Sequence, residues 1–447
     1  MNKFASILAI VNIAITIVSS NALRGSTRIR PQQDNRPRRH LLEAESECTL
    51  YLKFVSFEDG PNEESWSCEF PRTYAQGHFN GRDIMNIDGI NKADIDSLYP
   101  ISGESIMRTT GAYVEQFLDR ETSASNGGED IKLVVTNPSN VVIESITEND
   151  VRHHRYHKNR RQLSKINTGV IKTLVVRPIA PNGNVVDASA DQLRSDVFED
   201  EVCLKNQMEA CSFNQLEIRP ATVGNGGVVD VNIDINPIED DTRNGNRGEL
   251  AENAVLKTDQ LYGGQDGLAS EYDLVIFCQP PGSGRWDAFA YLNRFDSYYN
   301  KNRCSISGVL MHEVGHNFGL SHSGKGGGDI YGDITGYMGA GSTEDDGPKN
   351  CYNAVKNYRL GWYDLQTGST NPLEYTSNPK SFVLNGVTDY KKDGSSNGEL
   401  ISLRLEQFGD DNGVDFYLGY NRKAGINSGV SQGADQVILY SKDRGKF

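Results

Sequence analysis

Three histidines and one glutamate in this 447-residue sequence are spaced so that they could act together. They lie in residues 312–323, which read HEVGHNFGLSHS. His312 and His316 are four residues apart, so on a helix their side chains lie on one face, one turn apart. Two imidazole nitrogens at this spacing can bind one zinc ion at about 2.0–2.1 Å. The spacing therefore predicts a metal site.

The residues around this pair predict that the metal site is catalytic. Gly319 can adopt a positive φ, which ends the helix and lets His322 return as a third ligand. Three neutral nitrogens leave one coordination position free for water, whereas structural zinc sites are closed. Glu313 is beside His312 but turned round the helix, where it can act as a general base toward that water. We therefore expect one catalytic Zn²⁺ held by His312, His316 and His322, with Glu313 as the catalytic residue.

Two further observations support the metal site. A single histidine is usually an ordinary hydrogen-bonded residue, but the three in this segment are the only histidines after Arg161. Met338 follows His322 by 16 residues, within the tetrapeptide Gly-Tyr-Met-Gly. By itself it would be an ordinary core methionine. Behind three histidines, we interpret it as a Met-turn, a tight turn whose side chain forms an apolar floor beneath the ligands.

The elements that must hold these residues follow from hydrophobic spacing. Apolar residues at 306, 309, 310, 314 and 318 recur at helical spacing and predict a helix that carries the first two histidines. Before it we expect strands at 173–177, 229–235 and 272–278, a helix at 188–198 capped near Ser189 or Asp187, and an edge strand at 288–292 with one face buried. Short strands separated by Gly, Asn and Asp follow residue 365.

The N-terminal third has a different organisation. Residues 1–22 have the features of a secretory signal peptide, a membrane anchor being the alternative, and residues 23–45 those of a disordered linker. A small α+β unit at 46–150 is expected to contain strands at 49–54, 132–135 and 141–146 and a helix within 106–118. The basic stretch 152–161 ends in Arg160-Arg161, which is either a processing site or part of a solvated linker; we favour processing.

These segments define the expected domain organisation. Residues 1–22 are a signal peptide, 23–161 a propeptide, 162–365 a catalytic domain, and 366–447 a β-rich C-terminal region whose completeness stays open. The fold class is α+β. A net charge of −15 argues against nucleic acid or an anionic membrane as the main partner. No stretch after residue 22 is apolar enough to span a bilayer.

Seven cysteines in an exported chain predict disulfides and one unpaired thiol. We expect Cys304–Cys351 to bracket the metal segment and Cys211–Cys278 to form a second bridge, which leaves Cys203 free. Cys48 and Cys68 form a disulfide, or one of their thiols caps the zinc before processing; we favour the disulfide. Acidic residues at 230–241, 329, 333 and 344–346 could bind Ca²⁺ or form solvated loops.

The extended histidine motif with its methionine resembles the metzincin clan of zinc endopeptidases. Within that clan, the sequence resembles the gametolysin family of extracellular-matrix proteases. Besides the motif, the resemblance includes residues 193–198, 210–213, 276–280, 347–354, 360–363 and 420–422, within a span of roughly 165–447. It implies a catalytic domain built on a twisted mixed sheet with an active-site helix, zinc at the three histidines, a base at Glu313 and a Met-turn at Met338.

The sequence also departs from relatives in the clan. Gly339 and Ala340 follow Met338, so the zinc-binding tyrosine that follows the methionine in other metzincins has no counterpart, and Tyr337 is not given that role. Some gametolysins have glutamine as the first ligand, whereas this chain has His312. The resemblance further implies protein substrates among matrix or cell-wall glycoproteins.

The sequence as a whole predicts a secreted zinc metalloendopeptidase, made as a zymogen and cut by a processing protease. The alternative is a secreted matrix or adhesion protein that zinc merely stabilises. That alternative should lack a general base beside an open coordination position, and this sequence has Glu313.

Overall fold

The computed structural model describes residues 38–42, 46–79, 81–98, 100–116, 131–145, 167–238, 243–326, 328–341, 344–375, 379–406 and 413–443. The predicted signal peptide and the pair Arg160-Arg161 lie outside these residues. The chain divides into two units, Met1–Asn35 and Arg36–Phe447, and all elements below belong to the second. No helix among them is long and apolar enough to cross a membrane.

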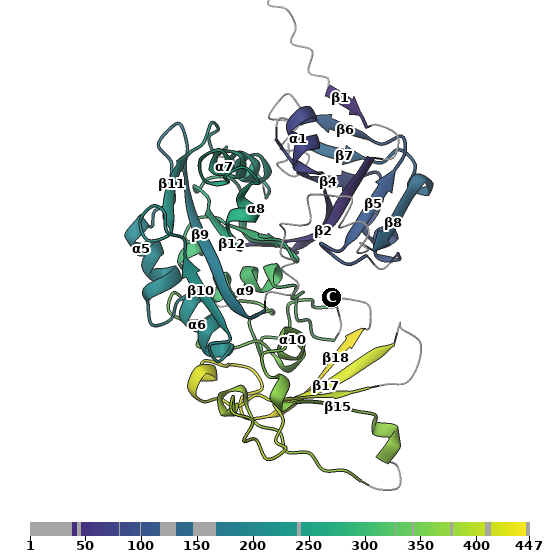
Figure 1. Ribbon diagram of the computed structural model, residues 1–447, viewed down its shortest axis with the longest axis vertical. Helices are drawn as coiled ribbons and strands as arrows, with labels where there is room; N and C mark the ends of the chain where they lie inside the picture. The colour runs from purple at the N-terminus through teal and green to yellow at the C-terminus, as the bar shows by residue number, and fades with distance from the viewer. Residues whose placement is uncertain are drawn as a thin grey trace, which may run out of the picture. The chain divides into compact units, whose positions relative to one another are not determined.

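The segment before the histidines contributes strands to a mixed sheet (Figure 1). A long strand, β9 (Gly169–Ile179), pairs in parallel with β10 (Leu216–Pro220), β11 (Val228–Asn232) and β12 (Leu274–Cys278). On the far side of β12 lies the parallel strand β14 (Asp296–Tyr299), followed by the antiparallel strand β13 (Trp286–Tyr291). The strands predicted at 173–177, 229–235 and 272–278 are confirmed, with boundaries shifted by a few residues.

Helices cover both faces of this sheet because its strands are apolar on both sides. Val175 and Ile276 belong to one core cluster, and Val176 and Phe277 to another. The first cluster packs against α5 (Ala190–Arg194), α6 (Leu204–Cys211) and α9 (Ser307–Asn317), and the second against α7 (Arg247–Tyr262) and α8 (Leu268–Glu271). Near-continuous hydrophobic strands with helices on either face are typical of buried parallel sheets.

Two predicted helices are confirmed. In the first, Ser189 accepts a hydrogen bond from the Gln192 N–H and so caps α5, which continues into the π-helical turn η3 (Ser195–Glu199). The second is α9, which carries His312 and His316 and ends just before Gly319, whose φ is 81°. A left-handed glycine directly after a helix is a common way to turn the chain. It directs the chain toward His322.

The N-terminal module, residues 38–145, is mostly strand. Its elements are β1 (Arg38–Leu41), β2 (Ser46–Phe57), β3 (Glu63–Glu69), α1 (Arg72–His78), β4 (Ile84–Asp88), α2 (Lys92–Asp96), β5 (Ser105–Thr109), β6 (Tyr113–Gln116), β7 (Ile131–Val134) and β8 (Val141–Ser145). The strands predicted near 49, 132 and 141 are confirmed. The helix predicted within 106–118 is wrong for its described part, which forms β5 and β6. Both pair with neighbouring strands, so tertiary contacts override the helix-like spacing.

The edge strand predicted at 288–292 is only partly right. β13 is a strand, but its outer side is paired with β2 of the N-terminal module, antiparallel and with Ala290 opposite Phe54. The sheet therefore continues without a break from the N-terminal module into the helix-covered region. Alternation in one strand indicates which side chains are buried. It cannot reveal a hydrogen-bonded neighbour more than 200 residues earlier in the chain.

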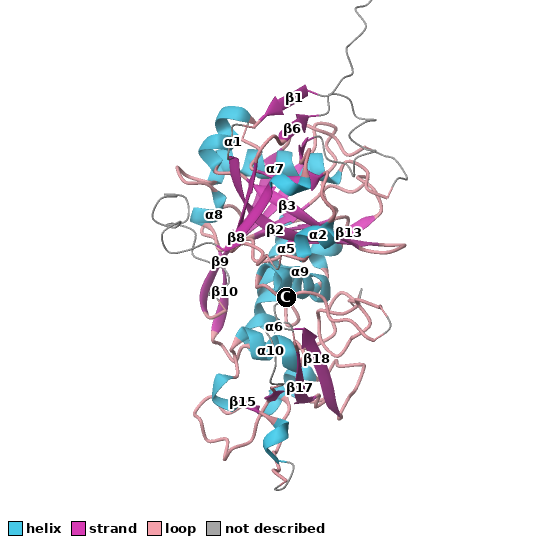
Figure 2. Ribbon diagram, turned by 90° about the vertical axis from the view of Figure 1, so that its right-hand side faces the viewer, coloured by secondary structure: helices cyan, strands magenta, loops and turns pink. Residues whose placement is uncertain are grey.

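The strands after residue 365 form a second, smaller sheet, in agreement with the predicted β-rich region (Figure 2). It consists of β15 (Thr367–Thr370), β16 (Ser402–Leu405), β17 (Val414–Tyr420) and β18 (Val437–Asp443). The helix α10 (Ala354–Leu360) packs against it, since Gly419 of β17 lies directly against Ala354. This arrangement places β18 close to the segment that follows His322.

The predicted disulfides are right in part. Cys48 and Cys68 are bonded and Cys203 is a buried free thiol, as expected. The other two pairings are wrong, because the structure contains Cys211–Cys351 and Cys278–Cys304. Cys304 lies just after β14, whose pairing with β12 brings it to Cys278. Cys211 ends α6, which packs on the segment around Cys351. Spacing along the sequence contains no information on either contact.

The contribution of the sheet core to the free energy of unfolding can be tested with two leucine substitutions. Leu274 of β12 is 1% exposed, whereas Leu261 of α7 is 64% exposed. Leu274→Ala should lower the free energy of unfolding by about 2.5–5 kcal/mol, because it leaves a cavity between sheet and helices. Leu261→Ala, the matched control, should change it by less than about 0.5 kcal/mol. Urea titration measures both, and similar losses would contradict the described packing.

Candidate metal centre

The three histidines predicted from the sequence lie together in the structure. Each offers one ring nitrogen, and these atoms all lie within 4.8 Å of one another. The Nε2 atoms of His316 and His322 are 3.1 Å apart. A tetrahedral ion bound at about 2.0–2.1 Å holds two nitrogens about 3.3 Å apart. The spacing therefore fits a shared metal ion.

Backbone carbonyls orient two of the rings. His312 Nδ1–H donates to the Tyr337 carbonyl at 2.7 Å, and His316 Nδ1–H donates to the Leu320 carbonyl at 2.7 Å. A carbonyl can only accept, so the proton of each neutral ring is on Nδ1 and the lone pair on Nε2. Such second contacts commonly fix the tautomer of metal-binding histidines. His312 Nε2 is buried and has no partner within the protein, as expected of an atom that binds a ligand.

The surroundings keep these rings neutral. Burial lowers the pKa of His312 to about 4 and lowers the pKa of His316 and His322 well below the ordinary value. The Lys356 ammonium adds to this effect, since its Nζ lies 3.3 Å from the His322 carbonyl. Neutral imidazole is the form that binds metal ions. The three rings can therefore bind a metal ion through their lone pairs.

Glu313 lies in the same buried environment. It is 2% exposed, and its Oε2 has no hydrogen-bond partner. Burial raises the pKa of Glu313 well above the ordinary value, and the nearby charge of Asp287 adds to the shift. A divalent cation beside the carboxyl would favour its ionised form and oppose both effects. A buried, unpartnered carboxyl oxygen on the helix that carries two of the three convergent histidines fits a site completed by a metal and a water.

Met338 lies against the helix between the first two histidines. A Cβ added at Gly315 would lie 2.5 Å from the Met338 sulfur, so a larger residue there would have to displace the methionine side chain. The Ser323 N–H donates to the Met338 carbonyl at 2.6 Å, which ties this turn to the segment after His322. Met338 therefore contacts the helix that carries the first two histidines, and its role as a Met-turn stays a prediction.

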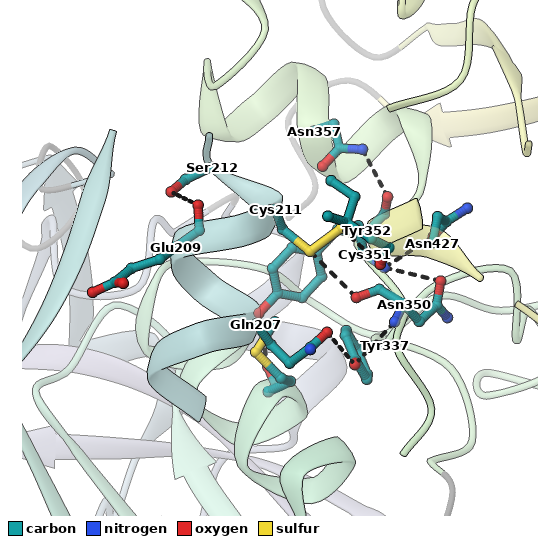
Figure 3. The surroundings of a disulfide bond; sticks show 12 residues. Gln207, Glu209, Cys211, Ser212, Tyr337, Asn350, Cys351, Tyr352, Asn357 and Asn427 are labelled. Atoms are coloured by element: carbon teal, nitrogen blue, oxygen red, sulfur yellow. Dashed lines mark hydrogen bonds between the residues drawn. A yellow bond between two sulfur atoms is a disulfide. The ribbon is translucent and has the colours of Figure 1, made fainter. Parts of the chain in front are cut away.

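A disulfide and two tyrosines anchor the turn from outside (Figure 3). Tyr337, whose carbonyl accepts from His312, donates through its hydroxyl to the Pro348 carbonyl at 2.5 Å. Three residues further on, Cys351 is bonded to Cys211 of α6. Tyr352 then donates to the Met311 carbonyl of α9 at 2.7 Å. Turn, helix and disulfide thus form one connected support for the histidines.

Some residues around the site were missed at the level of sequence. The Tyr331 ring lies 3.9 Å from the His322 ring, and Phe54 of β2 stacks on His316 at 4.4 Å. Asn353 donates to Ser323 at 3.1 Å and to Asp333 at 2.9 Å, linking α10 to the metal segment. Tyr331 follows a glycine-rich stretch without periodicity, and Phe54 is distant in sequence. No local pattern indicates either position.

The calcium prediction finds no support. Within the described ranges, the three histidines form the one group of His, Cys, Asp or Glu side chains suited to a metal ion. Asp333 is engaged with Thr335 and Asn353. Asp345 and Asp346 lie near Asp196, whose pKa is raised by burial first and by the charges of these neighbours second.

Residues 183–387 match the family model described as gametolysin peptidase M11. No curated protein matches the chain. The match and the clustered histidines indicate a metallopeptidase domain within residues 183–387. Within that class, the chain carries a gametolysin-family peptidase domain, as the sequence resemblance predicted. The matched residues include α9, all three histidines, Glu313 and Met338, and they exclude the N-terminal module.

The acidic cluster near α9 yields a pH prediction. Burial, and repulsion from Asp345 and Asp200, raise the pKa of Asp196 to about 6. The folded state then binds more protons than the unfolded state between about pH 4 and 6, so this group lowers stability as pH rises through that window. Asp196→Asn should therefore be more stable than wild type at pH 7.5, with a smaller difference at pH 4.5. Thermal unfolding at both pH values measures this.

The control is Asp191→Asn, five residues earlier on α5. A hydrogen bond from Asn225 and the charge of Arg194 lower the pKa of Asp191. Its stabilising contribution is present at neutral pH and is lost as pH falls, so its replacement should have the opposite sign. The same sign for both variants would contradict this interpretation.

Proposed function

We propose that this protein is a secreted zinc metalloendopeptidase that hydrolyses peptide bonds in extracellular proteins. The observation that carries the proposal is the convergence of three histidine nitrogens, two of them on the helix that also carries Glu313, whose buried carboxyl has an oxygen without a partner. Three protein ligands beside an open coordination position are typical of catalytic zinc sites. Zinc in such a site polarises a peptide carbonyl and makes a water molecule more acidic.

Each residue then has a defined role. His312, His316 and His322 hold the ion through Nε2, and the carbonyls of Tyr337 and Leu320 keep the first two rings in the required tautomer. Glu313 takes a proton from the attacking water and passes it to the leaving amine nitrogen. The buried surroundings exclude bulk water and strengthen these charge interactions. Met338 supports the ligand rings from beneath.

Secretion and the zymogen form belong to the same proposal. Three disulfides are consistent with an oxidising compartment, and the N-terminal signal sequence supplies a route to it. Cutting after Arg161 would separate the N-terminal module from the peptidase chain. The gametolysin family favours matrix or cell-wall glycoproteins as substrates. The rival function, a zinc-stabilised adhesion protein, gives no reason to bury an unpartnered carboxyl on the helix that carries two of the ligands.

Replacing the general base tests the mechanism. Glu313→Gln keeps the size of the side chain but cannot accept the proton, so peptide hydrolysis should fall by about 10²–10⁴-fold while zinc stays bound. Processed protein is assayed against a peptide library with and without chelator, and bound zinc is measured by atomic absorption. Glu217→Gln, on β10 with a half-exposed side chain, is the matched control and should retain wild-type cleavage.

The outcomes separate the two functions. Zinc-dependent cleavage by wild type that is lost in Glu313→Gln supports the peptidase. A wild-type protein that binds one zinc and cleaves nothing in the library would favour the adhesion protein. Cleavage that survives the chelator would show that the histidines are not the reaction centre.

A further inference from the structure

The first turn of α10 carries a buried cation next to the third histidine. Lys356 is 7% exposed, and its Nζ lies 3.3 Å from the Ser321 hydroxyl and 3.3 Å from the His322 carbonyl. An ammonium has three N–H donors, and these two acceptors engage only two of them. Among the described residues, the third donor has no acceptor, and no carboxylate forms an ion pair with Lys356. A buried charge is costly unless an opposite charge is bound to it.

The neighbouring charges do not neutralise this ammonium. Asp333 is near enough for its charge to act on Lys356, but its carboxylate accepts a hydrogen bond from Asn353 at 2.9 Å instead. Arg359 of the same helix and Lys442 of β18 are also near, and both repel the Lys356 charge. The electrostatic surroundings therefore favour the binding of an anion at Lys356.

Lys356 lines a cleft that includes part of the metal site. The cleft has a volume of about 1010 Å³, and besides residues of the N-terminal module its wall includes His322 and Ser323. Val437 and Leu439 of β18 also line it, and each is 58% exposed. Ligand sites commonly combine apolar walls with a few polar groups that fix the orientation of the ligand. A peptide bound at the metal can extend into this cleft, where Lys356 is a polar group of that kind.

Hydrogen bonds hold the C-terminal sheet against the metal segment. β18 lies beside α10 (Figure 1), and its Tyr440 hydroxyl is 3.0 Å from the Thr335 hydroxyl, three residues before Met338. The Ile334 N–H donates to the Gln432 side chain at 3.0 Å. The wall that β18 contributes is thus fixed before a ligand binds, which lowers the entropic cost of binding. This wall lies outside the residues that match the family model.

We propose that Lys356 is a specificity-determining residue, which binds a carboxylate of the peptide substrate in the cleft beside His322. The carboxylate belongs to an aspartate or glutamate side chain near the cleaved bond, or to the C-terminus of a short peptide. Either source gives the third N–H donor an acceptor and neutralises the buried charge. The substrates are then peptides with a carboxylate close to the cleaved bond. This inference deepens the proposed function and rests on it.

Paired peptides with blocked ends test the proposal on the processed wild-type protein. The members of a pair differ only by aspartate against asparagine, or glutamate against glutamine, at one position near the cleaved bond. At the favoured position, kcat/KM should be at least about tenfold higher for the carboxylate, because charge-assisted hydrogen bonds are stronger than neutral ones. A further pair, with a free or an amidated C-terminus, distinguishes the two sources of the carboxylate.

Lys356→Met tests which residue makes this distinction. The variant keeps an unbranched side chain without the charge, so kcat/KM for the two members of a pair should agree within about twofold. The ratio of two rates from one sample does not depend on the folded or zinc-loaded fraction. If Lys356 only supported the His322 segment, the ratio would stay as in wild type. Lys325→Gln, the matched control, removes an exposed charge from the same cleft and should change the ratio by less than about twofold.

A binding measurement makes the test independent of turnover. Zinc-loaded Glu313→Gln protein is titrated with a labelled carboxylate peptide and with its amide partner, and fluorescence anisotropy gives both Kd values. The carboxylate peptide should bind at least about tenfold more tightly. This measurement and the wild-type rates both use the native Lys356, so the proposal stays testable if Lys356→Met does not fold.

Each outcome decides one question. A carboxylate preference in wild type that disappears in Lys356→Met and persists in Lys325→Gln supports the proposal. Equal cleavage and equal binding of the paired peptides overturn it, as does a preference that persists in Lys356→Met. Both of these results leave the proposed function standing, because the wild-type protein still cleaves the peptides. A wild-type protein that cleaves none of them contradicts the proposed function, and this inference with it.

Discussion

The structure depends on the burial of ionisable groups that have no complete set of protein partners. His312 has one ring nitrogen fixed by a carbonyl and the other without a partner, and Glu313 has an oxygen without a partner. Such groups are costly to bury unless something binds them. The surrounding structure must then hold them against relaxation. The Met338 turn, the Cys211–Cys351 disulfide and the Tyr352 contact to α9 have this effect.

The same constraint connects the metal site to the sheet. The helix that carries two histidines is hydrogen-bonded to the end of β13, so the position of that strand and the position of the ligands are set together. The strand that pairs with β13 on the side away from β14 therefore lies near the metal site. In this chain that neighbour comes from the N-terminal module, and it brings an aromatic ring onto the ligands. The pairing of β2 with β13 thus places an aromatic ring of the N-terminal module against a predicted ligand.

Local patterns predicted much of this. The histidine helix, its glycine terminus, the buried strands β9 and β12 and the small C-terminal sheet were all foreseen, because each reflects periodicity or backbone preference within a short segment. The expectations that failed concern contacts between distant segments. Residues 105–116 form two strands because neighbouring strands pair with them. Two disulfide pairings were wrong because chain order does not give spatial proximity.

By itself, the sequence determined the chemistry available to this protein: three histidines at ligand spacing, a glutamate beside the first, and a glycine that turns the chain between the second and third. These depend on side-chain type and on helix geometry over a few residues. Only the tertiary structure decided how the ligands are oriented, which cysteines are bonded, and what lies on the outer edge of β13. Those outcomes depend on packing between segments that can be more than 200 residues apart in the chain. A local sequence pattern contains no information on such packing.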